Sequence, residues 1–128
     1  MAEKKIHLSL VTPEERVFEG EVSSIIIPAV SGLLGILPGH LPIVSQLGVG
    51  IVKIETEEGP KYIGVYRGYL EFFYNKANIL TGHAITTTFE QREETITQLK
   101  KKHEIVQKIT EETKRVTKAM ASLKTLEK

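Results

Sequence analysis

The pattern of apolar and polar residues changes period near residue 87. Up to about residue 83, apolar positions recur every second residue in short segments rich in Val, Ile and aromatic residues. Such alternation is typical of strands with one buried face. The predicted strand segments are 6–10, 17–18, 22–27, 42–47, 48–55, 61–66, 69–74 and 78–83, with Pro28 expected to end the third. Turns are expected at 58–60 and 75–77. Without helical segments between the strands, the pattern favours an antiparallel sandwich or barrel.

Residues 88–128 have a helical composition, because they contain neither Gly nor Pro and are dominated by Glu, Lys, Gln, Thr and Leu. Thr88 and Gln91 fit a capping box, with Phe89 placed to pack beneath the first turn. The apolar stripe (96, 99, 103, 106, then 109, 113, 116, 120, 123) changes phase between Val106 and Ile109. A bend near 107–110 would give two helices, whereas the alternative is one helix of about 38 residues, about 57 Å long.

Composition narrows the class of protein. A chain of 128 residues with 41% apolar and 26% charged residues fits one compact domain with an appendage. The longest uncharged stretch, Val22–Val52, is interrupted by Gly and Pro, so we expect no membrane-spanning helix. No secretory signal is visible, and the chain has no cysteine for a disulfide, a thiolate nucleophile or a cysteine zinc site.

Charge is divided unevenly along the chain. The net charge of +1 excludes a strong electrostatic case for nucleic acid. Residues 1–89 hold seven basic and nine acidic side chains, whereas residues 90–128 hold ten and seven. The basic tail is either an ordinary solvated helix surface, the more general interpretation, or an arm that docks on an acidic partner. For the second interpretation the candidate contacts are Lys100, Lys114, Arg115 and Lys118.

Residue patterns for catalysis are absent from the sequence. The glycines of 32–39 are not followed by the Lys-Ser/Thr of a phosphate loop, and no two histidines lie three or four residues apart. No serine sits in a nucleophile elbow. We therefore expect no catalytic residue, no cofactor and no metal. Five clustered aromatic residues (Tyr66, Tyr69, Phe72, Phe73 and Tyr74) are better explained by core packing than by stacking on nucleic acid.

Residues 32–42 stand out, because five large apolar side chains lie in a segment whose shape is fixed by Gly and Pro. Some of these side chains, Ile36 and Leu37 in the first place, are expected to enter the core. The others would form a small apolar contact patch for a partner.

Residues 35–42, Gly-Ile-Leu-Pro-Gly-His-Leu-Pro, resemble the signature Gly-Ile-x-Pro-Gly-His-x-Pro of the epsilon subunit of the F-type ATP synthase. A supporting match is Val65-x-x-Gly68-x-Leu70-Glu71-Phe72, followed by 78–80 and Ala84. The layout agrees over essentially the whole chain. The resemblance implies a ten-stranded antiparallel β-sandwich (1–87) that binds the gamma subunit and the c-ring, followed by a regulatory two-helix hairpin (88–128).

The resemblance also implies a role. Such a subunit performs no chemistry; it belongs to the rotating central stalk and couples ion-driven c-ring rotation to ATP synthesis. In bacteria its helices can also block rotation in the hydrolysis direction through transient contacts with the alpha and beta subunits. The expected place is peripheral, on the cytoplasmic face of the bacterial plasma membrane or on a plastid thylakoid. The isolated chain is expected to be monomeric. The predicted partner contacts are Ser31, Gly32, Leu33, Leu34, Pro38, His40 and Leu41.

Two departures from the family pattern qualify these expectations. Many members carry glutamate where this chain has Leu33, so a charged contact with the c-ring is not expected at that position. The ATP-binding motif of some bacterial members, Ile/Leu-Asp-x-x-Arg-Ala, is not matched at 89–95, so we expect no tight ATP binding. The alternatives are a β-sandwich ligand-binding module with a helical dimerisation tail, a nucleotide sensor, and an enzyme with His40 as a base.

Overall fold

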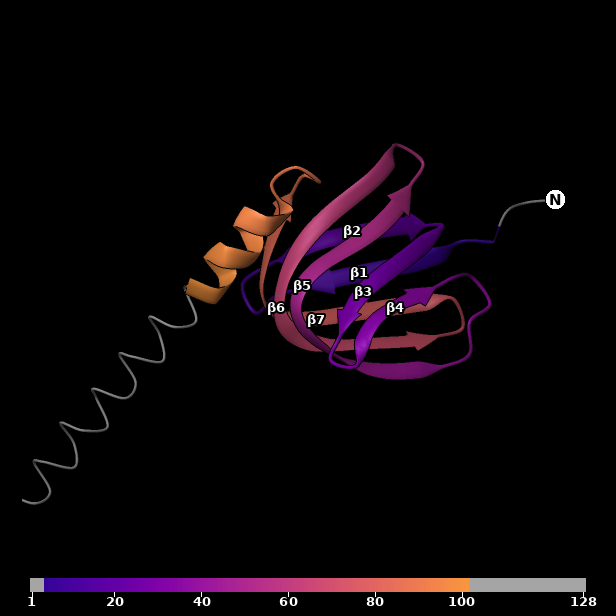
Figure 1. Cartoon of the computed structure of the whole chain (residues 1–128). Coiled ribbons are helices and arrows are strands. Elements are labelled where there is room, and N and C mark those ends of the chain that lie inside the picture. The colour runs from indigo at the N-terminus through magenta and orange to yellow at the C-terminus, as the bar shows by residue number, and fades with distance from the viewer. Residues whose placement is uncertain (1–3, 102–128) are drawn as a thin grey trace, which may run out of the picture.

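The computed structural model describes residues 4–101, which form seven strands and one helix (Figure 1). The strands are β1 (Ile6–Val11), β2 (Arg16–Val22), β3 (Ser24–Ala29), β4 (Gly32–Ile36), β5 (Ile43–Thr56), β6 (Gly59–Phe73) and β7 (Lys76–Thr87). The helix begins at residue 92 and is described to residue 101. Within residues 4–101, no helix is long and apolar enough to cross a membrane.

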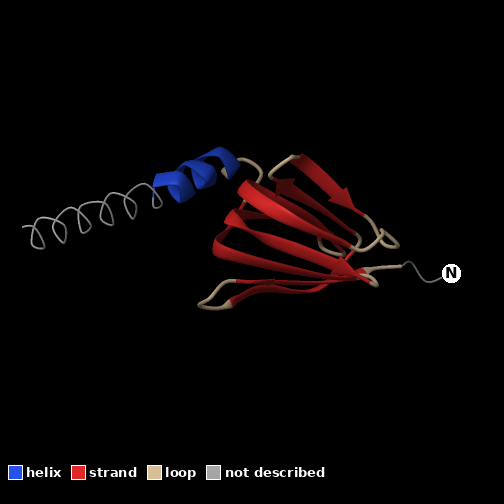
Figure 2. Ribbon diagram, turned by 90° about the horizontal axis from the view of Figure 1, so that it is seen from below, coloured by secondary structure: helices blue, strands red, loops and turns tan. Residues whose placement is uncertain are grey.

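One hydrogen-bonded sheet builds both layers of the domain. Its strand order is β2-β1-β7-β6-β5-β3-β4. The strands β5, β6 and β7 are 14, 15 and 12 residues long, and they curve so that the sheet folds over itself into a sandwich (Figures 1 and 2). The predicted sandwich is thus confirmed. The predicted antiparallel pairing holds for all the described neighbours except β1 and β7, which run parallel.

The core lies between the two layers and follows the alternation of the sequence. In β1 the side chains of Ile6, Leu8 and Leu10 are fully buried, whereas His7 is exposed. Burial of a large aliphatic side chain contributes about 1.5–3 kcal/mol, so the period-two pattern fixes which face of each strand turns inward. The other fully buried aliphatic residues come from β3 to β7: Ile25, Ile27, Ile36, Leu47, Val52, Ile54, Val65, Leu70 and Ile79.

The structure describes seven strands and not the ten that the resemblance implied. Two of the breaks expected between the predicted strand segments are bends within continuous strands. Segments 42–47 and 48–55 belong to β5, and segments 61–66 and 69–74 belong to β6. At the bend, Leu47 pairs with Gly68 and Val49 with Tyr66. The ladder therefore skips one residue on each strand, Gly48 on β5 and Arg67 on β6. Arg67 (φ 51°) and Gly68 (φ 147°) both have positive φ, a local change of backbone conformation that bends β6 without ending it.

Two further boundaries differ from the prediction. Pro28 lies inside β3 and pairs with Leu33 of β4, a strand within the segment that was expected to be a loop. A proline donates no hydrogen bond, and the pairing of β3 with β5 is irregular between Ile26 and Ala29, where Pro28 stands. The predicted turn at 75–77 lies one residue earlier. Tyr74 and Asn75 both have positive φ (48° and 57°), as a two-residue type I′ hairpin requires.

The start of the helix agrees with the predicted cap. The Gln91 amide donates to Thr88 Oγ1 over 3.3 Å, and regular helix begins at residue 92 after a turn at 89–91. The helix packs beside β6 and β7 (Figure 1). The second helix of the predicted hairpin, like the alternative of one long helix, would fall in 102–128, outside the described residues.

Candidate functional site

Ionisable side chains do not converge on a metal or catalytic centre in the part of the chain that the structure describes. No three His, Cys, Asp or Glu side chains among residues 4–101 gather in a metal-binding arrangement. His7 Nε2 lies 3.5 Å from Glu19 Oε1 on the surface, His40 stands in the loop after β4, and His83 is in β7. The candidate site is the set of contact residues predicted from the sequence, which lie between residues 31 and 41.

One hollow of about 400 Å³ lies between the start of the chain, β2 and the β5–β6 turn. Four of its charged side chains form two ion pairs: Lys5 bonds to Glu57, and Lys61 Nζ lies 3.6 Å from Glu58 Oε2. The hydrogen bond and charge of Lys5 lower the pKa of Glu57 below its ordinary value. Because both glutamates are more than 80% exposed, this is an arrangement of solvated ion pairs.

The first group of predicted contact residues lies on β4 and the turn before it. Ser31 and Gly32 are exposed at the β3–β4 turn, and the side chain of Leu33 is 79% exposed. Leu34 is half-buried and packs against the core, since its position alternates with that of Leu33. Leu34 thus supports β4 from the inner face, while Leu33 is available to a partner.

The second group lies in the loop 37–42, which has one hydrogen bond to the β6–β7 turn and one within the loop. The Gly39 amide donates to Asn75 Oδ1 over 2.7 Å, and the His40 amide donates to the Leu37 carbonyl oxygen over 3.1 Å. The His40 ring meets Phe72 edge-on, with centroids 5.8 Å apart. Pro38 is half-buried. His40 therefore has a positioning role in the loop.

This loop presents apolar side chains to solvent. Leu37 and Leu41 are 63% and 78% exposed. The prediction that Leu37 enters the core is therefore wrong, whereas Ile36, predicted with it, is fully buried. Glycine is required at position 39, because its φ of 86° lies in the left-handed range. A fixed backbone with exposed leucines is suited to contact with another apolar surface, since few conformations are lost on binding.

The two predicted groups lie at opposite ends of β4. The turn at Ser31 lies beside β5, where the Val30 amide donates to the Gln46 carbonyl oxygen over 2.9 Å. The loop 37–42 follows the other end of β4 and lies beside Asn75. The structure therefore divides the predicted contact residues into two separate patches.

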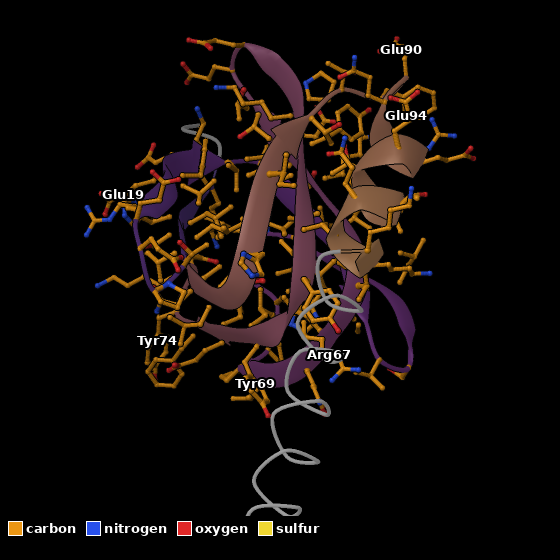
Figure 3. The ribbon with its side chains drawn as sticks, turned by 90° about the vertical axis from the view of Figure 1, so that its left-hand side faces the viewer. Glu19, Arg67, Tyr69, Tyr74, Glu90 and Glu94 are labelled. Atoms are coloured by element: carbon orange, nitrogen blue, oxygen red, sulfur yellow. The ribbon has the colours of Figure 1, made fainter. Side chains whose placement is uncertain are left out.

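A third apolar area, not predicted from the sequence, lies on the outer face of β5, β6 and β7. Val44, Tyr69 and Leu80 are 72%, 56% and 58% exposed, and Tyr69 pairs directly with Leu80. Figure 3 shows Tyr69 and Tyr74 pointing outward along one side of the domain, away from Glu90 and Glu94 at the helix.

Core packing, predicted for the aromatic cluster, holds fully only for Phe72. It is wrong for Tyr69, Phe73 and Tyr74, which are 56%, 51% and 79% exposed. The exposure of Tyr69 and Phe73 could have been predicted from the alternation in β6, which places both side chains on the same face as the charged Glu71. Of the predicted tail contacts, Lys100 is exposed on the helix, while Lys114, Arg115 and Lys118 lie outside the described residues.

Comparison with known proteins places these features in a family. Residues 5–87 match the beta-sandwich domain of the ATP synthase delta/epsilon chain. An ATP synthase epsilon chain from Leptospira interrogans is 41% identical over 83 residues, which are 65% of this chain and 65% of that one. The aligned part thus spans slightly less than two thirds of that relative. An epsilon chain from Helicobacter pylori is 36% identical over 98 residues, covering 75% of this chain and 80% of the relative.

Solved structures agree in fold. A chain in the cryo-EM structure of the Euglena gracilis mitochondrial ATP synthase (OSCP, F1 and c-ring) is 27% identical, with a TM-score of 0.61 over 68% of this chain and 58% of that one. A chain in the central stalk and c-ring structure from Tetrahymena thermophila is 17% identical, with a TM-score of 0.55 over 66% and 69% of the two chains, which shows a shared fold. The match of residues 5–87 to the family's beta-sandwich domain and the similarity to the Helicobacter pylori epsilon chain together establish that this chain belongs to the ATP synthase epsilon-chain family.

Proposed function

We propose that this chain is a non-catalytic subunit of the central stalk of an F-type ATP synthase. In this role it binds the gamma subunit and the c-ring and couples ion-driven rotation of the ring to ATP synthesis in the catalytic head. It is held at the membrane through the complex, on the cytoplasmic side in a bacterium. The sandwich, 1–87, makes the permanent contacts, and residues 88–128 form the regulatory part.

The observation that carries the proposal is the apolar loop 37–42. Leu37 and Leu41 are largely exposed, yet the loop backbone is fixed by the hydrogen bonds of Gly39 and His40. Exposed apolar groups on a fixed loop are favourable only when another surface covers them. A permanent neighbour in an assembly would cover them, and the family membership supports the gamma subunit or the c-ring as that neighbour.

The sheet is suited to transmitting force. The β5–β6 ladder pairs thirteen residues on each strand, and β6 pairs with β7 over most of its length. Because these strands pass through the bend without interruption, a load on the loop 37–42 is carried by backbone hydrogen bonds into both layers. Such a ladder deforms less than a domain made from separate short strands.

The tail is proposed to restrain ATP hydrolysis. Its excess of basic residues favours contact with acidic segments of the alpha and beta subunits. Lys100 is exposed on the described part of the helix and is available for such a contact. A switch of this kind requires two tail positions that differ by about a few kcal/mol, so that a partner can shift the balance.

Purification of the assembled complex through a tag on the gamma subunit tests the proposal. A chain with Leu37→Ser and Leu41→Ser should be recovered with the complex in much smaller amount than the unaltered chain, because the apolar contact is lost. Glu58→Ser, at the exposed β5–β6 turn, is the control and should be recovered normally. Equal recovery of both variants would contradict the role of the loop, and an isolated chain that dimerises would favour the ligand-binding alternative.

A further inference from the structure

The first turns of the helix dock on the sandwich through two side chains. Thr95 and Leu99 are 5% and 2% exposed, whereas the other described positions of the helix are half-buried or exposed. Residues four apart lie on the same side of a helix, so these two side chains form one small contact face. Figure 3 shows this part of the helix lying along the strands.

Both side chains meet the sheet at Gly64 of β6. A Cβ atom at position 64 would lie 2.5 Å from Thr95 Cγ2 and 3.2 Å from Leu99 Cδ1. The backbone at Gly64 does not have positive φ, so the conformation of the strand does not require glycine there. The missing side chain instead leaves a notch, a common reason for glycine inside a strand.

Hydrogen bonding holds Thr95 in the orientation that fills this notch. Thr95 Oγ1 donates to Thr87 Oγ1 over 2.7 Å and lies 3.1 Å from the Gln91 carbonyl oxygen. A hydroxyl fixed in this way also fixes the methyl group on the same Cβ atom. Thr95 therefore cannot turn its methyl away from position 64 without losing these bonds.

The contact is separate from the main core. Leu99 is buried but does not belong to the continuous cluster of core residues in the sandwich. Phe89 makes a second contact, in the connection before the helix. Its ring centroid lies 5.8 Å from that of Tyr62 and 3.9 Å from Cζ of the Arg92 guanidinium. Loss of this contact would therefore remove no residue of the sandwich core cluster.

We propose that Gly64, Thr95 and Leu99 form a latch for the tail, and that the size of the side chain at position 64 sets the ratio of docked to undocked helix. The latch is a property of the isolated chain. It goes beyond the proposed function, because it does not depend on the partners of the chain or on what the tail does in an assembly.

Hydrogen exchange of the full-length chain tests the latch. Gly64→Ala should raise the exchange rates of amides 96–101 about tenfold, as expected for a small overpacked contact. Amides of the β5–β6 ladder, such as those of Val52 and Ile63, should keep their rates. Gly82→Ala is the matched control, because a Cβ there would meet only the Tyr66 carbonyl oxygen at 3.7 Å, an ordinary contact. It should leave the helix rates unchanged.

A compensating change makes the test specific. Thr95→Ser removes Cγ2 but keeps the hydroxyl, so the pair Gly64→Ala with Thr95→Ser should return the helix rates toward those of the unaltered chain. Helix rates in Gly64→Ala within twofold of the unaltered chain would overturn the latch, as would a pair that exchanges as fast as Gly64→Ala alone. If Gly64→Ala loosens the whole sandwich, Leu99→Ala decides: faster exchange confined to the helix supports the latch, and unchanged exchange overturns it.

Discussion

Substitution of Gly68 by alanine should severely destabilise the sandwich. A Cβ atom there would lie 2.0 Å from the Leu80 carbonyl oxygen and 2.9 Å from Thr81 Cα, both of which are backbone atoms of the paired strand. The φ of 147° is also one that L side chains rarely adopt. Overpacking costs about 1–3 kcal/mol and a sparsely populated backbone conformation about as much, so we expect the free energy of unfolding to fall by about 4 kcal/mol.

Urea unfolding followed by far-ultraviolet circular dichroism measures this loss. The midpoint should fall while the dependence on urea stays the same, since the surface exposed on unfolding does not change. Gly82→Ala, in the neighbouring strand and without positive φ, is the control and should change the free energy of unfolding by less than about 0.5 kcal/mol. A loss below about 1 kcal/mol for Gly68→Ala would refute the view that the bend in β6 requires glycine at this position.

Three further predictions concern the loop, the surface charges and the tail. Asn75→Gly keeps the positive φ of the turn but removes the acceptor of the Gly39 amide, so hydrogen exchange at Gly39 should accelerate with little change in the urea midpoint; an unchanged rate would show that this bond does not hold the loop. Glu57 should titrate below an ordinary glutamate by nuclear magnetic resonance, and Lys5→Gln or added salt should remove the difference. Because the pKa of Glu57 is lower in the folded than in the unfolded chain, its ion pair stabilises the fold above the ordinary glutamate pKa, and this contribution is lost as the pH falls through the lowered pKa. A Glu57 that titrates normally would contradict the ion pair. Reversal of 114, 115 and 118 to glutamate should raise ATP hydrolysis by the assembled enzyme, and unchanged hydrolysis would count against docking of the basic tail.

The alternation along the sequence was sufficient to predict the strand-rich domain and its buried face. In β1 the buried positions Ile6, Leu8 and Leu10 alternate with positions that are exposed or half-buried. The exposure of Leu33 and Leu41 agrees with the apolar patch predicted in 32–42, whereas Leu37 was expected in the core, and contact of this patch with a partner stays a prediction. The cap at Thr88 was predicted from two residues three apart.

Long-range geometry accounts for the features that could not be predicted. Gly48 and Gly68 look like strand ends in the sequence, and only the ladder, in which Leu47 pairs with Gly68 and Val49 with Tyr66, shows that both strands continue through this point. Parallel pairing of β1 with β7 joins residues about seventy positions apart, which no local pattern encodes. Burial of Thr95 depends on the notch at Gly64, so a polar residue on the helix is covered because of a missing side chain on a distant strand.

The parallel pairing of β1 with β7 has a consequence for how the chain reaches its native state. Among the strands of residues 4–101, the hairpin of β1 and β2 has β7 as its one neighbour in the sheet, and β7 is the last of these strands to leave the ribosome. Contacts between such distant segments form slowly, because a large loop must close before they yield any stabilisation. During synthesis the backbone groups of β1 that pair with β7 therefore stay unpaired until β7 is made. In a chain released before residue 80, this edge stays available for wrong pairing with other chains.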